Sequence, residues 1–142
     1  MSVIVAIADA VTAELNAGGF SEPFTAQRLY RPQFELADMD TLHVTVVPQG
    51  ISIEAVGRGL NQYDFRIDVA VQKRFSEGDA AELDPLMQLV EAIVDYFRFK
   101  RLETTPEAAW VKTENAPIYS PEHMEQLRQF TSVVTLTYRV VR

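Results

Sequence analysis

The sequence contains no cysteine. Such a chain forms no disulfide, binds no metal through thiolates and has no cysteine nucleophile, and it suits synthesis in the reducing cytoplasm. Histidine is scarce as well, since only His43 and His123 are present, and they form no H-E-x-x-H pattern. None of the serines stands in a G-x-S-x-G elbow. These absences predict a protein without a catalytic centre, a bound metal or a cofactor.

Basic residues are in the minority, with 13 lysines and arginines against 20 acidic residues, a net charge of −7 and an isoelectric point near 4.8. Proteins that hold nucleic acid through its phosphates carry the opposite balance. Long apolar runs are also missing. The first residues, MSVIVAIADAVTAELNAGG, lack a basic stretch and are interrupted by Asp9 and Glu14. We therefore expect no secretory signal, no membrane span and no binding of DNA by charge.

The composition that remains is that of an ordinary globular protein, with 142 residues of which 47% are hydrophobic and 23% charged. A chain of this length buries roughly 68% of its unfolded surface, which is enough for one core without disulfides. We therefore expect a single domain over residues 1–142.

Hydrophobic periodicity predicts two helices and about six strands. The helices span 2–17 and 79–102, and the strands span 24–31, 41–47, 51–56, 63–75, 110–113 and 130–141. A turn is expected at 48–50 and a single helical turn at 121–126. Because the strands bunch in the middle and at the end, the order favours an α+β fold. We expect an antiparallel or mixed sheet of five to six strands, with two main helices that cover one face or clamp the sheet between them.

The strand expected at 63–75 has one apolar face and one charged face. The charged face would carry Asp64, Arg66, Asp68, Gln72 and Arg74. Charges of alternating sign suit an exposed face that keeps a protein in solution. They also suit a self-complementary contact between subunits, in which Arg66 and Asp68 would take part.

The segment 48–62 combines three glycines with apolar residues, among them Ile51 and Ile53, which alternate with polar ones as in a strand. It forms either an ordinary hairpin or a strand that leans out to pair with the sheet edge of a neighbouring subunit. In the second interpretation Ile51, Ile53 and Arg58 are contact residues, and Arg58 at the tip meets an acidic neighbour.

One loop invites a metal interpretation, because Glu35, Asp38 and Asp40 could bind a hard cation through oxygen. The loop lacks the ligand spacing and the central glycine of an EF-hand, so a solvated acidic loop is the better interpretation. Trp110 stands alone in its predicted strand and is interpreted as a core residue.

Three stretches of the sequence carry a resemblance to a known family. They are GLNQYDFRIDVAVQK (59–73), WVKTENAPIYSPEHM (110–124) and LRQFTSVVTLTYR (127–139). All are similar to small proteins encoded among the structural genes of tailed phages and prophages. The order of elements resembles the tail-terminator, or tail-completion, proteins of the phage neck.

This resemblance implies a structural virion protein, made in the cytoplasm of a bacterial host, that forms a hexameric ring, caps the tail tube and joins it to the head connector. Its partners would be copies of itself, the tail tube protein and head-connector or adaptor proteins, with no membrane involved. A compact domain of this length has a diameter of about 37 Å, and six touching spheres leave a hole of about that width. A DNA duplex about 20 Å across passes through such a hole. The net charge of −7 suits a conduit without specific DNA binding.

Other functions stay open on the sequence alone. A head-completion (stopper) or adaptor protein of the same neck is a near neighbour of the terminator. A stand-alone module that encloses a small ligand would need a deep apolar pocket. A hydrolase using Asp or Glu would need paired carboxylates in a cleft, and no such pair is visible in the sequence.

Overall fold

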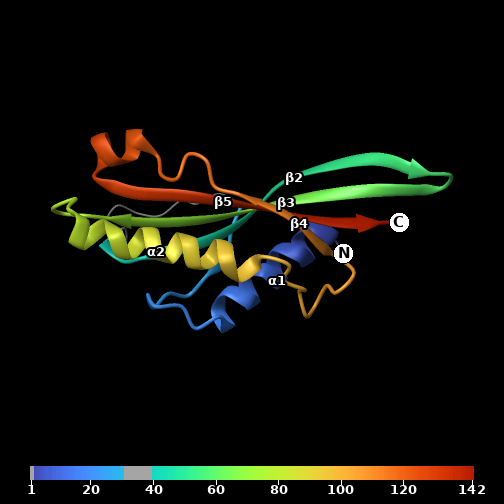
Figure 1. Cartoon of the computed structure of the whole chain (residues 1–142), viewed down its shortest axis with the longest axis horizontal. Coiled ribbons are helices and arrows are strands. Elements are labelled where there is room, and N and C mark those ends of the chain that lie inside the picture. The colour runs from blue at the N-terminus through green and yellow to red at the C-terminus, as the bar shows by residue number, and fades with distance from the viewer. Residues whose placement is uncertain (1, 31–39) are drawn as a thin grey trace.

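A five-stranded mixed sheet and two α-helices make up most of the regular structure in residues 2–30 and 40–142, which the computed structural model describes (Figure 1). The helices are α1 (Val3–Ala17) and α2 (Ala80–Phe97), together with the short π-helical turn η2 (His123–Leu127). The strands are β1 (Gln27–Arg28), β2 (His43–Gly57), β3 (Leu60–Arg74), β4 (Ala109–Glu114) and β5 (Gln129–Val141). The predicted α+β fold with two main helices is confirmed.

The strands lie side by side in the order β1-β2-β3-β5-β4. β1 is parallel to β2, and the other neighbouring pairs are antiparallel. β2 and β4 therefore run in opposite directions near opposite sides of the sheet. The strand predicted at 24–31 is wrong in length, since among its described residues, 24–30, only Gln27–Arg28 form a strand with β2. One reason is that the Asn16 side chain bonds both backbone groups of Ala26, which a strand would need for its own ladder.

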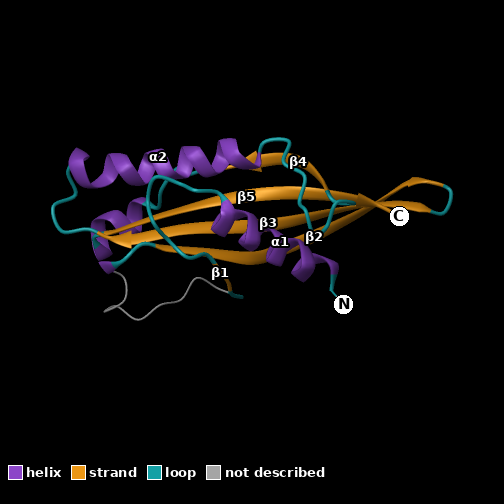
Figure 2. Cartoon of the chain, turned by 90° about the horizontal axis from the view of Figure 1, so that it is seen from below, coloured by secondary structure: helices purple, strands orange, loops and turns teal. Residues whose placement is uncertain are grey.

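Both α-helices pack on the same face of the sheet (Figures 1 and 2). Each begins at a capping residue: the Ser2 hydroxyl accepts from the backbone N–H of Val5, and the Asp79 carboxylate accepts from that of Glu82. Apolar residues at helical spacing then turn one stripe of each helix toward the sheet. The shared core includes Ile7, Val11, Leu15, Ile67, Val69, Leu86, Leu89, Val90, Ile93, Phe97, Leu136 and Tyr138. Within the described part of the chain, no helix is long and apolar enough to cross a membrane.

α2 is shorter than the helix predicted at 79–102. It ends at Phe97, where Arg98 adopts an extended conformation. Phe99 follows with a φ of 56°, a left-handed conformation that stops a helix and is uncommon for a bulky residue. Leu102 is fully buried, so the chain turns back into the core directly after this point. Arg98, Lys100 and Arg101, which fall within the range predicted for this helix, therefore lie beyond its end.

β2 is one continuous strand where two strands and a turn were predicted. The turn at 48–50 is wrong, because β2 stays paired with β3 through this region, with a shift of register between Pro48 and Gly50. A bulge of this kind is a common place for proline in a strand. A Cβ atom at position 50 would lie 2.7 Å from the Arg66 guanidinium, so Gly50 makes room for that side chain.

The β2–β3 hairpin extends past the helices and lengthens the molecule in one direction (Figures 1 and 2). Each strand has 15 residues, which corresponds to about 50 Å at about 3.3 Å per residue. The diameter of about 37 Å expected for a sphere is therefore too small. β5 accompanies β3 almost to the tip, where Asn61 and Arg142 exchange two backbone hydrogen bonds of 2.8 and 2.9 Å.

Candidate functional site

Residues 49–62, which we call the outer hairpin, carry apolar side chains that the described part of the chain leaves about half exposed. Ile51 lies opposite Phe65, and Ile53 lies opposite Tyr63. Because directly opposite residues share a face, both isoleucines lie on the face of the sheet that bears the helices. Their side chains are nevertheless 52% and 58% exposed. The hairpin interpretation of this segment is confirmed, and its contact with a neighbouring subunit stays a prediction.

Arg58 lies at the far end of the outer hairpin. It forms the turn between β2 and β3 together with Gly59, whose φ of 77° suits glycine. The Arg58 side chain is exposed, as a residue that meets a partner must be. The structure therefore brings Ile51, Ile53 and Arg58 together on one projecting element.

Two strand edges of the sheet are open in the part of the chain that the structure describes. β1 covers β2 only at Thr45 and Val46, so no described strand pairs with the outer side of β2 from Gln49 to the tip. β4 is the last strand on the other side of the sheet. An unpaired edge presents backbone donors and acceptors to any strand that comes alongside.

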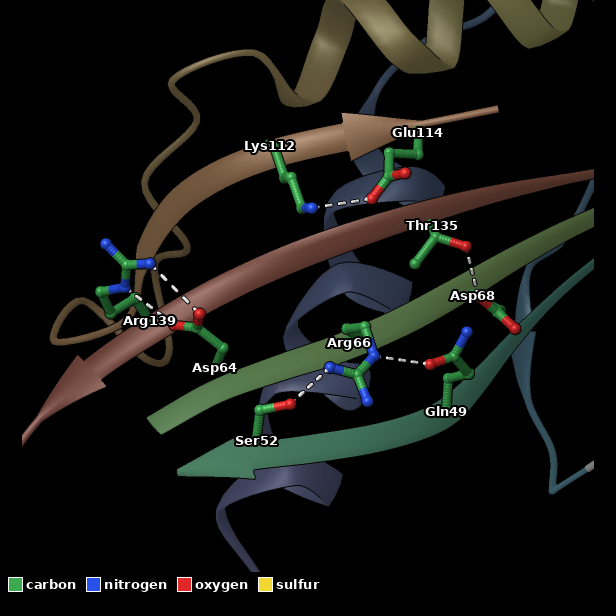
Figure 3. Close-up of polar contacts among 9 residues, drawn as sticks. All are labelled: Gln49, Ser52, Asp64, Arg66, Asp68, Lys112, Glu114, Thr135 and Arg139. Atoms are coloured by element: carbon green, nitrogen blue, oxygen red, sulfur yellow. Dashed lines mark hydrogen bonds and ion pairs between the residues drawn. The ribbon is translucent and has the colours of Figure 1, made fainter. Parts of the chain in front are cut away.

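The face of the sheet turned away from the helices is charged along the outer hairpin and its neighbours (Figure 3). Arg66 donates to Gln49 Oε1 and to Ser52 Oγ, each at 2.8 Å, and so ties β3 to β2. Asp68 accepts a hydrogen bond of 2.7 Å from the Thr135 hydroxyl on β5. The predicted contact residues Arg66 and Asp68 thus lie on one face, as expected. Each of them bonds to a neighbouring strand of its own chain.

Two carboxylates on this charged face have opposite pKa shifts. Asp64 accepts two hydrogen bonds from the Arg139 guanidinium, at 2.8 and 3.1 Å, which lowers its pKa. Burial raises the pKa of Asp68, and this effect outweighs the hydrogen bond from Thr135 and the charge of Arg66. Arg139 thus stabilises the anionic form of Asp64, whereas burial destabilises the anionic form of Asp68.

The inner part of the same face is covered by residues 115–128. The Ser120 backbone N–H donates to the Thr131 carbonyl at 2.8 Å and holds this segment against β5. Gln72, which pairs with Thr131 in the sheet, is therefore buried, and the prediction that it belongs to the exposed face is wrong. Arg74 at the end of β3 is exposed, as predicted.

The depressions on the described surface are open and lined with charged groups. One has a volume of about 530 Å³ and is lined by Asp40, Lys73, Arg74, Phe75, Ser76, Glu82 and Arg128. Its Glu82 carboxylate accepts three backbone N–H bonds from residues 76–78, which lower its pKa and give it a capping role. Another, on the charged sheet face, has a volume of about 290 Å³ and is bordered by Arg66, Asp68 and Glu114. Neither resembles the deep apolar pocket that a small-ligand module would need.

Within residues 2–30 and 40–142, no three His, Cys, Asp or Glu side chains come together as metal ligands would. His123 Nδ1 lies 2.8 Å from Thr131 Oγ1, which suits a histidine that holds the 115–128 segment in place. Of the acidic loop considered as a cation site, Glu35 and Asp38 lie outside the described residues. The absence of a metal, a cofactor and a catalytic centre stays a prediction.

An aromatic pair at β4, made of the exposed Phe99 and the partly buried Trp110, was not foreseen from the sequence. Phe99 is 82% exposed and contacts Trp110 edge to face, with 4.9 Å between ring centroids. Trp110 also packs against the core, so its interpretation as a core residue holds for part of the side chain. A depression of about 200 Å³ adjoins the pair and is lined by Phe99, Lys100, Arg101, Pro106, Ala108, Ala109 and Trp110. The sequence feature that could have indicated an exposed aromatic side chain here is the single phenylalanine within the basic run RFKR (98–101).

No protein-family model and no curated protein matches the chain. Among solved structures, the chain is similar to one described as an extracellular contractile injection system, "PVC sheath/tube terminator in extended state". The match has a TM-score of 0.50 and 16% sequence identity, and it covers 100% of this chain and 57% of that chain. This chain thus spans a little over half the length of the solved terminator. At this identity the likeness concerns the fold, and the whole of the present fold has a counterpart in the terminator.

Proposed function

We propose that this chain is a structural subunit of a tail-terminator ring, in which six copies close the end of a tail tube and leave a channel for DNA. Residues 1–142 act as one terminator-like domain. The ring joins the tube to the head connector in a virion assembled in a bacterial host. Its partners are copies of itself, the tube protein and connector or adaptor proteins.

The observation that carries this proposal is the outer hairpin, which projects with uncovered isoleucines and an open strand edge from a fold shared with a terminator. A monomer gains nothing from apolar side chains held in water, whereas an assembly buries them. Contact between a hairpin and a different surface of the next copy is heterologous, and such contacts close rings. Arg66 and Asp68 support this contact by holding β2, β3 and β5 together at the base of the outer hairpin.

The charge of the chain supports the passage of DNA through the ring. A net charge of −7 per copy gives DNA phosphates no general attraction to the protein. A duplex can therefore slide through without being held. Passage of DNA through the channel of the ring requires no base-specific contact.

Electron microscopy and sedimentation at high protein concentration test the ring. The wild-type chain should form closed rings of six. A variant with Ile51→Ser, Ile53→Ser and Arg58→Glu should fold normally, because these side chains are exposed, yet stay monomeric. The matched control Leu127→Ser changes an exposed apolar residue on η2 and should leave the rings intact. A wild-type chain that stays monomeric, rings that persist in the triple variant, or unfolding of that variant would contradict the proposal.

A further inference from the structure

Both open edges of the sheet carry exposed apolar side chains on the same face. At the β2 edge these are Ile51 and Ile53, and at the β4 edge the exposed side chain is Phe99, which adjoins the partly buried Trp110. Trp110 lies opposite Tyr138, a core residue, so it too is on the face that bears the helices. The two edges therefore offer matching chemistry on the same side of the molecule.

The residues at the two edges also lie in one row across the sheet. Successive partners in the strand register are Ile51 and Phe65, then Phe65 and Tyr138, then Tyr138 and Trp110. The row begins with an isoleucine at one open edge and ends with a tryptophan at the other. When two copies of the same orientation lie side by side, the row continues from Trp110 of one copy to Ile51 of the next.

The directions of the strands suit this arrangement. β2 and β4 run in opposite directions within one chain, so in two copies of equal orientation the β2 edge meets the β4 edge as an antiparallel pair. On the opposite face of these strands, Lys112 forms an ion pair of 3.0 Å with Glu114 of the same strand.

Phe99 gives an independent indication that the β4 edge is a binding surface. Its φ of 56° favours glycine, and its ring is 82% exposed. A bulky residue in this conformation is a genuine outlier, and such outliers gather at functional sites. The backbone conformation is unfavourable for phenylalanine, and most of the ring surface lies in water beside its aromatic contact, the ring of Trp110. Burial of the Phe99 ring against a second chain would remove its apolar surface from water and so stabilise an assembly.

We propose that the outer edge of β2 in one copy pairs with the edge of β4 in the next copy, with Ile51 and Ile53 packed against Phe99 and Trp110. The approximately 200 Å³ depression between Phe99, Pro106 and Trp110 receives the isoleucine side chains. This inference rests on the proposed ring and names the surface that receives the hairpin. The contact is head to tail, so it repeats until the ring closes.

Cross-linking tests the contact directly, because a chain without cysteine can carry single thiols at chosen positions. Copies with Ile53→Cys are mixed with copies carrying Arg101→Cys, which lines the depression, and are treated with a short bis-maleimide. A covalent dimer is expected from this mixture. Neither Ile53→Cys alone nor its mixture with the control Glu91→Cys, on the exposed side of α2, should give one. The double variant Ile53→Cys, Arg101→Cys should give a ladder of products that ends at six.

The variant Phe99→Gly separates assembly from folding. Glycine relieves the unfavourable backbone conformation at this position, which offsets the loss of the ring contact with Trp110, so the midpoint of urea denaturation should stay close to that of the wild type. Ring formation should require about 30-fold more protein, as expected when a central aromatic contact residue is truncated. The matched control Tyr30→Ala removes another largely exposed aromatic side chain, which follows β1, and it should assemble normally.

The possible results distinguish a failure of the proposed ring from a failure of the proposed contact between β2 and β4. Wild-type monomers at every concentration would overturn the ring and the contact together. Rings that fail in the hairpin variant but persist in Phe99→Gly, without a link between positions 53 and 101, would overturn only the contact with β4. A strong link between two Ile53→Cys copies would show that two hairpins meet, and it would also overturn the head-to-tail contact.

Discussion

The two halves of the β2–β3 hairpin follow the same alternation of apolar and polar residues but differ in burial. Ile67 and Val69 in the inner half are fully buried beneath the helices, whereas Ile51 and Ile53 in the outer half are more than half exposed. All four lie on the same face. Alternation in a strand therefore identifies the apolar face, and only the placement of the helices decides which part of that face is core and which part is left for a partner.

The strongest test of this comparison replaces one isoleucine in each half. Ile67→Ala should lower the free energy of unfolding by about 3 kcal/mol, because it removes buried methyl groups and leaves a cavity. Ile53→Ala should lower it by less than about 1 kcal/mol, because the side chain is exposed in the monomer. Urea denaturation of monomeric protein measures both values. Equal losses would mean that the outer half is as buried as the inner half.

A second test uses the two carboxylates of the charged face. Asp64 lies on the outer half, and Asp68 lies where the two halves meet. At pH 7, Asp64→Asn should lower the free energy of unfolding by less than about 1 kcal/mol, since its pair with Arg139 is partly exposed. Asp68→Asn should raise it by less than about 1 kcal/mol, since it removes a half-buried charge and keeps an acceptor for Thr135.

The pH dependence of these two variants should differ in sign. The raised pKa of Asp68 stabilises the folded chain below the unfolded value of about 3.9, and this contribution is lost as the pH rises through the folded pKa. The lowered pKa of Asp64 has the reverse effect: its contribution is present above about pH 3.9 and is lost as the pH falls through the folded pKa. Urea titrations between about pH 3 and about pH 7 measure both trends. Shifts of the same sign would contradict the burial assigned to Asp68.

The smallest effect is expected from the histidines, which both lie on the inner half of the molecule. The double variant His43→Gln, His123→Gln should form rings like the wild type, because the outer hairpin and the β4 edge are unchanged. Sedimentation and micrographs measure ring formation, with circular dichroism as the control for folding. Loss of rings in a folded double variant would give the histidines a role in assembly.

Much of the fold could be predicted because its main elements repeat a strong pattern. The helical stripes of α1 and α2 and the long alternations of β3 and β5 leave little choice of structure. The predicted turn at 48–50 failed because Pro48 and Gly50, which usually mark turns, are accommodated here by a bulge beside Arg66. The length predicted for α2 was too great because nothing in the local sequence pattern indicates that Phe99 adopts a positive φ outside the helix.

The part of the candidate site that depends on local sequence pattern could also be predicted. Gly57 and Gly59, which follow the alternating residues from Ile51 to Val56, mark a hairpin within a short segment of the sequence. The open edge of β4 depends instead on the order of strands, which local periodicity does not specify. Gln72 was misplaced because residues 115–128, which cover it, are distant in the sequence from β3.

The two backbone hydrogen bonds between Asn61 and Arg142 have a practical consequence. Residues added after Arg142 would start beside the hairpin tip, in the space that the proposed contact gives to a neighbouring copy. A purification tag at this end would therefore compete with assembly and could hold a ring-forming protein in the monomeric state. Oligomerisation should be measured on protein from which such a tag has been removed.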